Sequence, residues 1–253
     1  MGKDDVRVIE IKQSVFADND RKADELRARL RDQEIFLLNL MSSPGSGKTT
    51  TLLRTIEALR GELSLAVMDA DIDSTVDAAT VASTGTRAVQ LHTGGMCHLD
   101  AYMTEQGLDE LLAGGPADSP AAGAGRADSP AASAGHAGPG PVDLAILENV
   151  GNLVCPAEFD TGASKNAMIL SVPEGDDKPL KYPLMFSVCD VVLINKIDAL
   201  PVFDTFSMER AIENIHMRNP DAEVIPISAK TGEGVDAWAA WLRREVAAWK
   251  QGR

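Results

Sequence analysis

The chain has 253 residues, 44% of them hydrophobic, which is enough to bury one sizeable α/β core. Its formal net charge of -14 argues against nucleic acids and anionic membranes as partners, because both recognise basic surfaces. No apolar run has the length needed to span a bilayer, and the first residues lack the hydrophobic segment of a signal peptide, so we expect a cytoplasmic protein.

The N-terminal part is strongly charged and carries apolar residues at helical spacing. The spacing of Phe16, Ala23, Leu26 and Leu30 predicts an amphipathic helix over 14–31. We therefore expect residues 1–34 to form a helical extension that packs against a main domain spanning 35–253.

Short apolar runs alternate with helical or loop patterns along the rest of the chain. Buried strands of this kind, separated by helices, are typical of a mostly parallel sheet with helices on both faces. Ligands of such α/β folds bind where the strands end. The predicted strands are 35–41, 63–68, 88–91, 144–147, 168–172, 191–194 and 224–227.

The first strand runs directly into the sequence Ser-Ser-Pro-Gly-Ser-Gly-Lys-Thr-Thr at 42–50, which predicts a phosphate-binding loop. Glycines let backbone N–H groups surround phosphate oxygens, a lysine supplies a cation to the β and γ phosphates, and a threonine hydroxyl binds Mg²⁺. One position departs from the usual pattern, because Ser42 replaces the first glycine. The expected nucleotide contacts are Gly45, Ser46, Gly47, Lys48, Thr49 and Thr50.

The segment 114–141 interrupts this pattern. ADSPAAGAGR at 117–126 is followed at once by the near copy ADSPAASAGH at 127–136. A stretch of Ala, Gly, Ser and Pro without large apolar residues cannot offset its ordering entropy by burial. We expect a disordered insertion between a helix and the next strand.

The sequence Asn-Lys-Ile-Asp at 195–198 follows another predicted strand. A carboxylate there can accept hydrogen bonds from N1–H and the exocyclic amine of guanine, which adenine cannot offer. A Ser-Ala-Lys loop at 228–230 follows the last predicted strand and matches the loop that completes a guanine pocket. The pattern favours GTP and GDP, held by Asn195, Lys196, Asp198, Ser228, Ala229 and Lys230.

The sequence Glu-Asn-Val-Gly at 148–151 ends a further predicted strand. We expect Glu148 to belong to the nucleotide site and Gly151 to present its N–H to the γ phosphate. The nucleotide state would then set the position of this loop.

Cys97 and His98 follow a strand and a Gly-Gly turn, and Cys155 lies four residues beyond Gly151, so all three fall at the same edge of the sheet. Thiolate and imidazole ligands suit Ni²⁺ and Zn²⁺, and a symmetric dimer would complete a site that has three ligands per chain. The alternative is that the cysteines are small buried residues and His98 makes its own hydrogen bond. Cys189, within SVCDVVLI, is expected in the core.

These motifs, with GGMCHLDA at 94–101, ENVGNLVCPAEFD at 148–160 and EGDDKPLKYP at 174–183, resemble the HypB family of GTPases, which assist nickel insertion into the large subunit of nickel-iron hydrogenases. The resemblance covers about 35–249 apart from the insertion. It implies a slow GTPase that forms a homodimer on binding GTP or metal, with a HypA-like nickel protein and the hydrogenase large-subunit precursor as partners.

The resemblance also implies an acidic switch after the strand 63–68. Asp71 would hold Mg²⁺ through water and Asp77 would orient the attacking water, making them catalytic together with Lys48; the alternative is that both carboxylates cap helices. Ala70 and Thr75 depart from the family pattern. Lys178 and Lys181 would either reach the nucleotide of the partner protomer or be ordinary exposed lysines.

Two other functions fit parts of this pattern. A urease-type accessory GTPase presents a Cys-Pro-His ligand pair, whereas here Cys97 is followed directly by His98. A metal-binding docking platform would use the nucleotide only as a structural ligand, and the altered positions Ala70 and Thr75 are compatible with it.

Overall fold

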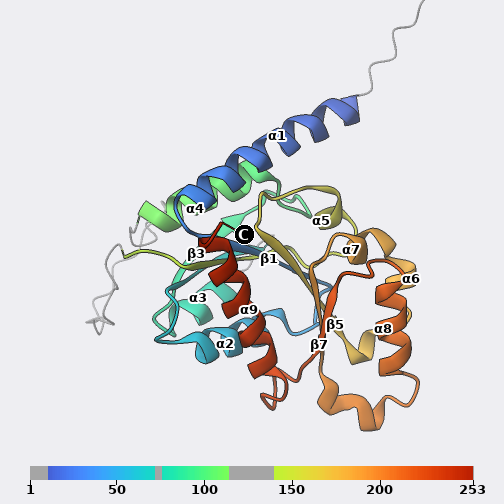
Figure 1. Cartoon of the computed structure of the whole chain (residues 1–253). Coiled ribbons are helices and arrows are strands. Elements are labelled where there is room, and N and C mark those ends of the chain that lie inside the picture. The colour runs from blue at the N-terminus through green and yellow to red at the C-terminus, as the bar shows by residue number, and fades with distance from the viewer. Residues whose placement is uncertain (1–10, 72–75, 114–139, 253) are drawn as a thin grey trace, which may run out of the picture.

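A single sheet of seven parallel strands forms the centre of the molecule in the computed structural model, which describes residues 11–71, 76–113 and 140–252 (Figure 1). The strand order is β3-β2-β4-β1-β5-β6-β7. Every strand runs in the same direction, as the buried apolar runs predict. The strands are β1 (Phe36–Ser42), β2 (Leu65–Asp71), β3 (Arg87–His92), β4 (Leu144–Glu148), β5 (Lys165–Ser171), β6 (Val191–Asn195) and β7 (Glu223–Pro226).

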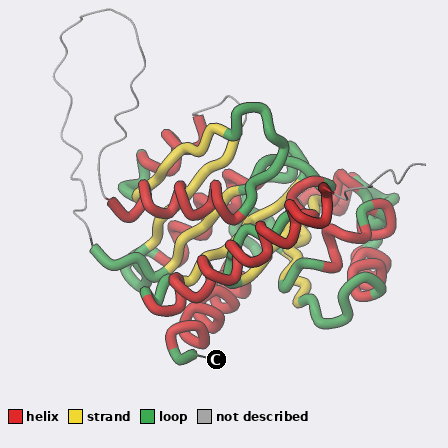
Figure 2. Tube along the Cα trace, turned by 90° about the horizontal axis from the view of Figure 1, so that it is seen from above, coloured by secondary structure: helices red, strands yellow, loops and turns green. Residues whose placement is uncertain are grey.

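Helices cover both faces of the sheet, and in Figure 2 the strands lie between helical layers. In Figure 1, α1 and α4 lie above the strands labelled β1 and β3, and α2, α3 and α9 lie below them. The α-helices are α1 (Ile11–Asp32), α2 (Lys48–Leu59), α3 (Val76–Ala82), α4 (Ala101–Ala113), α5 (Cys155–Glu158), α6 (Lys178–Lys181), α7 (Pro183–Ser187), α8 (Met208–His216) and α9 (Val235–Lys250). Two 3₁₀ turns are η1 (Val172–Glu174) and η2 (Ile197–Val202).

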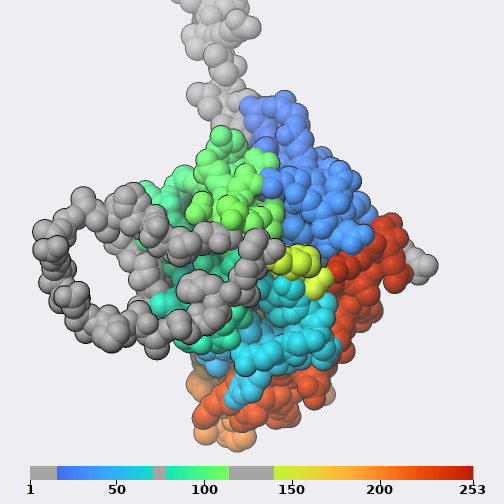
Figure 3. Space-filling model, turned by 90° about the vertical axis from the view of Figure 1, so that its left-hand side faces the viewer, coloured from blue at the N-terminus to red at the C-terminus, as the bar shows by residue number. Residues whose placement is uncertain are grey.

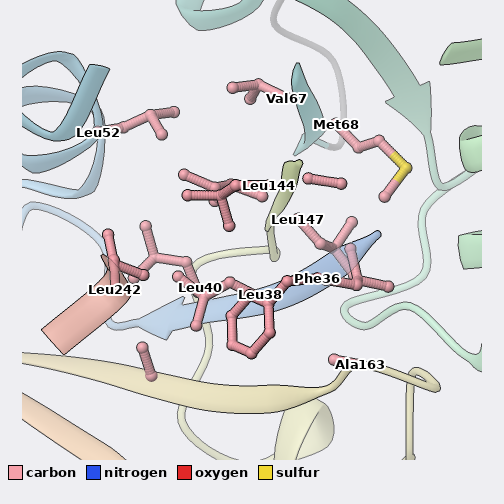
Figure 4. Close-up of a cluster of buried hydrophobic side chains, with 14 of the residues drawn as sticks. Phe36, Leu38, Leu40, Leu52, Val67, Met68, Leu144, Leu147, Ala163 and Leu242 are labelled. Carbon is pink, nitrogen blue, oxygen red and sulfur yellow. The ribbon is translucent and has the colours of Figure 1, made fainter. Parts of the chain in front are cut away.

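The hydrophobic core surrounds the two central strands, β1 and β4, whose residues are all buried. Phe36, Leu38 and Leu40 of β1 lie among side chains of β2, β4, α2 and α9 in Figure 4. Each fully buried leucine or phenylalanine contributes about 1.5–3 kcal/mol of transfer free energy. The rigid centre fixes the strand ends, and the phosphate-binding loop emerges from one of them.

The N-terminal helix is confirmed and is slightly longer than the sequence predicts. Ala23, Leu26 and Leu30 are fully buried, and α1 lies beside α4, as the blue and green surfaces in Figure 3 show. Its charged residues make ion pairs with α4, among them Lys22 with Glu105 at 2.6 Å.

All seven predicted strands are present, but several boundaries differ, two of them by three residues: β5 begins at Lys165 rather than at residue 168, and β2 ends later than predicted. The sequence ends the second strand at residue 68, whereas β2 continues to Asp71. Parallel pairing explains the extension, because Asp69 lies opposite Glu148 of β4 and Asp71 opposite His92 of β3. Backbone hydrogen bonds to two neighbouring strands therefore outweigh the low strand preference of aspartate.

Several expectations concern parts of the chain outside this description. The insertion 114–141 lies between α4 and β4 as predicted, but its residues 114–139 and Thr75 lie outside the described residues. The side chains of Asp71 and Asp77 are also outside the description, although their backbones belong to β2 and α3. The division into a 1–34 extension and a 35–253 domain stays a prediction. Within the described ranges, no helix is long and apolar enough to cross a membrane.

Candidate nucleotide site and metal centre

The loop after β1 turns sharply at two glycines. Gly45 and Gly47 have φ angles of 75° and 98°, in the left-handed region that side chains rarely adopt. A Cβ atom at Gly47 would lie 2.6 Å from Nδ2 of Asn195. The glycines of the predicted phosphate-binding loop are therefore required by both backbone conformation and space.

Helix α2 starts at Lys48 directly after this loop, and no side chain caps it. Its first-turn N–H groups and the positive end of its dipole suit an anion. The hydroxyl of Ser46 is buried and has no hydrogen-bond partner among the described residues. A cavity of about 600 Å³ opens here, lined by Lys48, Thr49 and Thr50. These features form a cradle for phosphate groups.

Acidic side chains line the cavity from the neighbouring strands. Asp69 and Glu148 lie opposite each other on β2 and β4, both nearly fully buried, and both contribute to the cavity wall. Carboxylates that share a cavity with a threonine hydroxyl suit Mg²⁺. The sequence pattern indicates Glu148 but not Asp69, because the predicted strand 63–68 ends one residue before Asp69. The signal was its position, because Asp69 directly follows the predicted strand 63–68, at the strand end where ligands of α/β folds bind.

Gly151 lies against the phosphate-binding loop, as the sequence predicts. A Cβ atom placed on Gly151 would lie 3.3 Å from Pro44 and 3.4 Å from Nζ of Lys48. The fold therefore brings the Gly151 backbone beside the lysine expected to bind the β and γ phosphates. Its role as a γ-phosphate sensor stays a prediction.

Asn195 links the phosphate-binding loop to the expected guanine site. Its Nδ2 donates to the carbonyl of Ser46 at 2.9 Å, and its Oδ1 accepts from the N–H of Ala229 at 3.0 Å. Because Asn195 is buried, these bonds are shielded from water. The phosphate-binding loop and the Ser-Ala-Lys loop are thus held by one amide.

The carboxylate of Asp198 is held in place by its neighbours. Its Oδ1 accepts from the Ser228 hydroxyl at 2.6 Å, and Lys230 lies 3.8 Å from its other oxygen. The Ser228 hydrogen bond is the main cause of the lowered pKa of Asp198, which keeps the carboxylate ionised, as the predicted role of guanine acceptor requires. Lys196 donates to the carbonyl of Gly45 at 2.6 Å. The predicted guanine residues therefore converge.

Arg54 of α2 supports the same region and was not predicted. Its Nε donates to the carbonyl of Ala229 at 2.9 Å, and Nη2 donates to that of Lys230 at 3.1 Å. Its signal in the sequence was weak, because an arginine on a surface helix is common.

The predicted metal ligands come together at the same edge of the sheet. The thiol of Cys97 donates to Sγ of Cys155 at 2.8 Å, and ligand atoms of Cys97, His98 and Cys155 all lie within 4.8 Å of one another. The pKa of Cys155 is raised, mainly by the hydrogen bond that it shares with Cys97, because removing the shared proton would leave two thiolates side by side.

Short local structures position these ligands. The Thr93 hydroxyl donates to the carbonyl of Met96 at 2.7 Å and closes the turn that precedes Cys97. Cys155 is the first residue of α5, and the side chain of Asn152 accepts from the N–H of Val154 at 2.8 Å just before it. Both ligand segments are therefore short turns anchored to strand ends.

The surroundings of His98 suit a metal ligand. Its ring stacks on Phe159 with centroids 4.0 Å apart, and its buried Nδ1 has no hydrogen-bond partner among the described residues. Desolvation lowers the pKa of His98, which favours the neutral imidazole that binds metals. The alternative of a histidine satisfied by its own hydrogen bonds does not hold for Nδ1. Phe159 lies within the family-like segment 148–160, but nothing in the sequence indicates its contact with His98.

Cys189 belongs to the core, as predicted, and is 1% exposed. Its thiol donates to the carbonyl of Met185 at 2.9 Å, and burial raises the pKa of Cys189 strongly. Lys181 pairs with Asp177 of its own chain at 2.6 Å. Its predicted reach to a partner's nucleotide stays untested.

The sequence model of the nucleotide-binding domain of CobW/HypB/UreG proteins matches residues 36–226. The hydrogenase maturation factor HypB of Azotobacter vinelandii is 45% identical over 241 residues, which cover 94% of this chain and 70% of that protein. The hydrogenase/urease maturation factor HypB of Helicobacter pylori is 35% identical over 242 residues, covering 96% and 88%.

Solved structures give the same relationship. The crystal structure of HypB from Helicobacter pylori in complex with nickel superposes with a TM-score of 0.77 at 35% sequence identity, covering 91% of this chain and 95% of that chain. The sequence alignments and the structural superposition both cover most of this chain. The chain therefore belongs to the HypB family of hydrogenase maturation factors, within the CobW/HypB/UreG group of nucleotide-binding proteins.

Proposed function

We propose that the protein is a GTP-hydrolysing metallochaperone that binds nickel at Cys97, His98 and Cys155 and assists nickel insertion into the large subunit of a nickel-iron hydrogenase. One observation carries the proposal: the segment from Gly151 to Cys155 connects the wall of the phosphate cavity directly to the sulfur pair. Membership of the HypB family and the nickel complex of the Helicobacter pylori relative support it.

In the nucleotide site, we assign phosphate binding to the loop of Gly45 to Gly47 and to Lys48. Bound Mg²⁺ would neutralise charge that develops on the phosphates. Thr49 and Asp71 would hold it, and Asp69 and Glu148 supply further carboxylates at the cavity wall. Asp77 would orient the attacking water.

In the guanine site, Asp198 would accept from the base, and the loop of Ser228 to Lys230 would enclose it. The hydrogen bond from Ser228 already sets the orientation of the Asp198 carboxylate. A fixed acceptor discriminates between bases, because a base lacking the matching donors leaves it unpaired. GTP and GDP are therefore the nucleotides that fit.

The short segment between the nucleotide site and the metal ligands would couple nucleotide binding to metal binding. Cys155 lies four residues beyond Gly151, and Asn152 stiffens the segment by its hydrogen bond to the Val154 N–H. A shift of Gly151 between the GTP and GDP states would therefore move Cys155 relative to Cys97. Two sites that bias one loop affect each other's affinity reciprocally.

The metal is cargo in this scheme, and three ligands per chain leave room for another ligand donor. Two copies related by a two-fold axis would complete the set and explain a homodimer formed on GTP or metal binding.

Nickel would arrive from a HypA-like nickel protein and pass to the hydrogenase large-subunit precursor in the cytoplasm. Zn²⁺ suits the same ligands. We expect neither nucleic acid nor a membrane as a partner, because the chain carries a net negative charge.

A second candidate is a metal-binding docking platform that keeps the nucleotide only as a structural ligand. The observation favouring it is Ala70, which replaces the residue expected from the family and lines the cavity. A role in urease maturation is supported only by likeness to the Helicobacter pylori relative, which is a hydrogenase/urease maturation factor.

The experiment is a phosphate-release assay with GTP and ATP, run beside nickel titration on the same protein. We expect slow release from GTP, none above background from ATP, and one nickel site that requires Cys97 and Cys155. Lys48→Ala is the control for nucleotide-dependent release. Stoichiometric nickel binding without any phosphate release from GTP would reject the GTPase and favour the docking platform.

A further inference from the structure

Helix α1 contacts segments next to the proposed metal ligands as well as the core. Its second half is anchored by the fully buried Leu26 and Leu30, whereas its first half lies over the start of α4 and the segment that follows α5 (Figure 1). These two segments directly follow the residues proposed as metal ligands. The nucleotide site does not explain why a helix from the N-terminal extension contacts both.

The side chain of Asn19 joins the two ligand-bearing segments directly. Its Oδ1 accepts from the N–H of Ala101 at 3.0 Å, and its Nδ2 donates to the carbonyl of Asp160 at 2.9 Å. Ala101 begins α4 three residues after His98, and Asp160 lies five residues after Cys155. One amide therefore satisfies a first-turn N–H of α4 and a loop carbonyl after α5.

Two further contacts hold the same segment. Phe16 of α1 packs on Phe159 with ring centroids 4.9 Å apart, and the His98 ring stacks on the same Phe159. Arg27 donates to the Ala163 carbonyl at 3.0 Å and pairs with Asp160 at 2.5 Å. The approach of α1 to the metal centre is thus fixed by amide, aromatic and ionic contacts.

We propose that Asn19 is a positioning residue for the metal centre: by bridging Ala101 and Asp160 it sets the separation between the Cys97–His98 segment and the Cys155 segment. This rests on the proposed nickel site. Residues that hold metal ligands in place commonly change metal affinity tenfold to a hundredfold when replaced, because the ligands must otherwise be ordered on binding. The N-terminal helix then becomes part of the metal-binding unit.

The test is nickel titration of the full chain in its GDP-bound form, followed by the sulfur-to-nickel absorption band. We expect Asn19→Ala to weaken nickel binding about tenfold or more and to change the band, since the sulfur positions change. Asn19→Asp keeps an acceptor for the Ala101 N–H but loses the donor to Asp160, so its affinity should be intermediate.

Asn214→Ala is the matched control. Its side chain also donates to a backbone carbonyl, that of Asp176 at 2.9 Å, on a different part of the molecule. It should leave nickel affinity and the band unchanged. GDP affinity should be unchanged in all three variants.

An Asn19→Ala protein that loses thermal stability but binds nickel within twofold of the parent, with the same band, would overturn the proposal. If Asn19→Ala does not fold, Asn19→Asp is compared with the parent instead. An Asn19→Asp protein with the nickel affinity and absorption band of the parent would reject the proposal. A parent whose nickel binding survives loss of Cys97 and Cys155 would instead refute the proposed metal site, and this inference with it.

Discussion

The sulfur of Cys97 lies 2.8 Å from the sulfur of Cys155, although the two residues are 58 positions apart in the chain. One belongs to the turn before α4 and the other begins α5, and the strands that precede them, β3 and β4, are separated in the sheet by β2. The thiol pair is therefore a product of the tertiary fold, and it suits a soft metal ion.

Replacing each of the three cysteines should have different effects on nickel affinity. Cys97→Ala or Cys155→Ala should weaken nickel binding by more than about a hundredfold, because each removes a direct ligand. Cys189→Ala is the internal control: it should lower the free energy of unfolding by about 1 kcal/mol, by leaving a small cavity, without changing nickel affinity. Nickel titration and denaturant unfolding check both effects. Equal nickel affinity in all three variants would contradict the assignment.

Nickel affinity should rise with pH. Each cysteine must lose its proton to bind the metal, so protons compete at low pH and cease to compete above the thiol pKa. Because the pKa of Cys155 is raised, the increase should continue beyond about pH 8.5, the ordinary thiol value. Release of one or two protons gives about a tenfold to hundredfold change per pH unit. Titrations across a pH series measure this slope, and a flat profile from about pH 6.5 to 8.5 would exclude thiol ligands.

Gly47→Ala should damage the nucleotide site more than a glycine replacement made elsewhere. The new methyl group would lie 2.6 Å from Asn195, in a backbone conformation that L-residues avoid. We expect a loss of about 2–3 kcal/mol in stability from strain and overpacking, with weaker GDP binding.

Gly61→Ala is the control for Gly47→Ala, because Gly61 has a φ of 80° but no atom within 4 Å of its added Cβ. It should cost only about 1 kcal/mol, from backbone strain, and leave GDP affinity unchanged. Unfolding curves and fluorescent GDP titration compare the pair. Identical losses in both variants would mean that the Asn195 contact has no energetic effect.

Asp198→Asn should change the preferred base. An asparagine cannot accept from both N1–H and the amine of guanine, so GDP binding should weaken about a hundredfold. Its amide can instead donate to the C2 carbonyl of xanthine, so xanthosine diphosphate should bind better than it does to the parent. Competition titrations measure both, with the exposed Asp204→Asn as control. Unchanged preference for GDP would remove Asp198 from the guanine site.

Much of the fold and site is predictable from local sequence. Buried apolar runs predict all seven strands, and the Gly-Ser-Gly-Lys-Thr pattern predicts the phosphate-binding loop, because each depends on a short-range physical requirement. The end of β2 was missed since Asp69 is held in the strand by pairing with β4, which is a long-range effect. Phe159, Asn19 and Arg54 act through contacts with distant segments, and a single sequence carries no signal for such pairs.

The most direct measurement is nickel titration of the parent with GDP and then with a non-hydrolysable GTP analogue, repeated on a Cys97→Ala, Cys155→Ala double variant while oligomeric state is followed. We expect nickel affinity and dimer content both to change with the nucleotide, and nickel binding to be lost in the double variant. Nickel binding that ignores the nucleotide, or that persists without the two cysteines, would contradict this expectation.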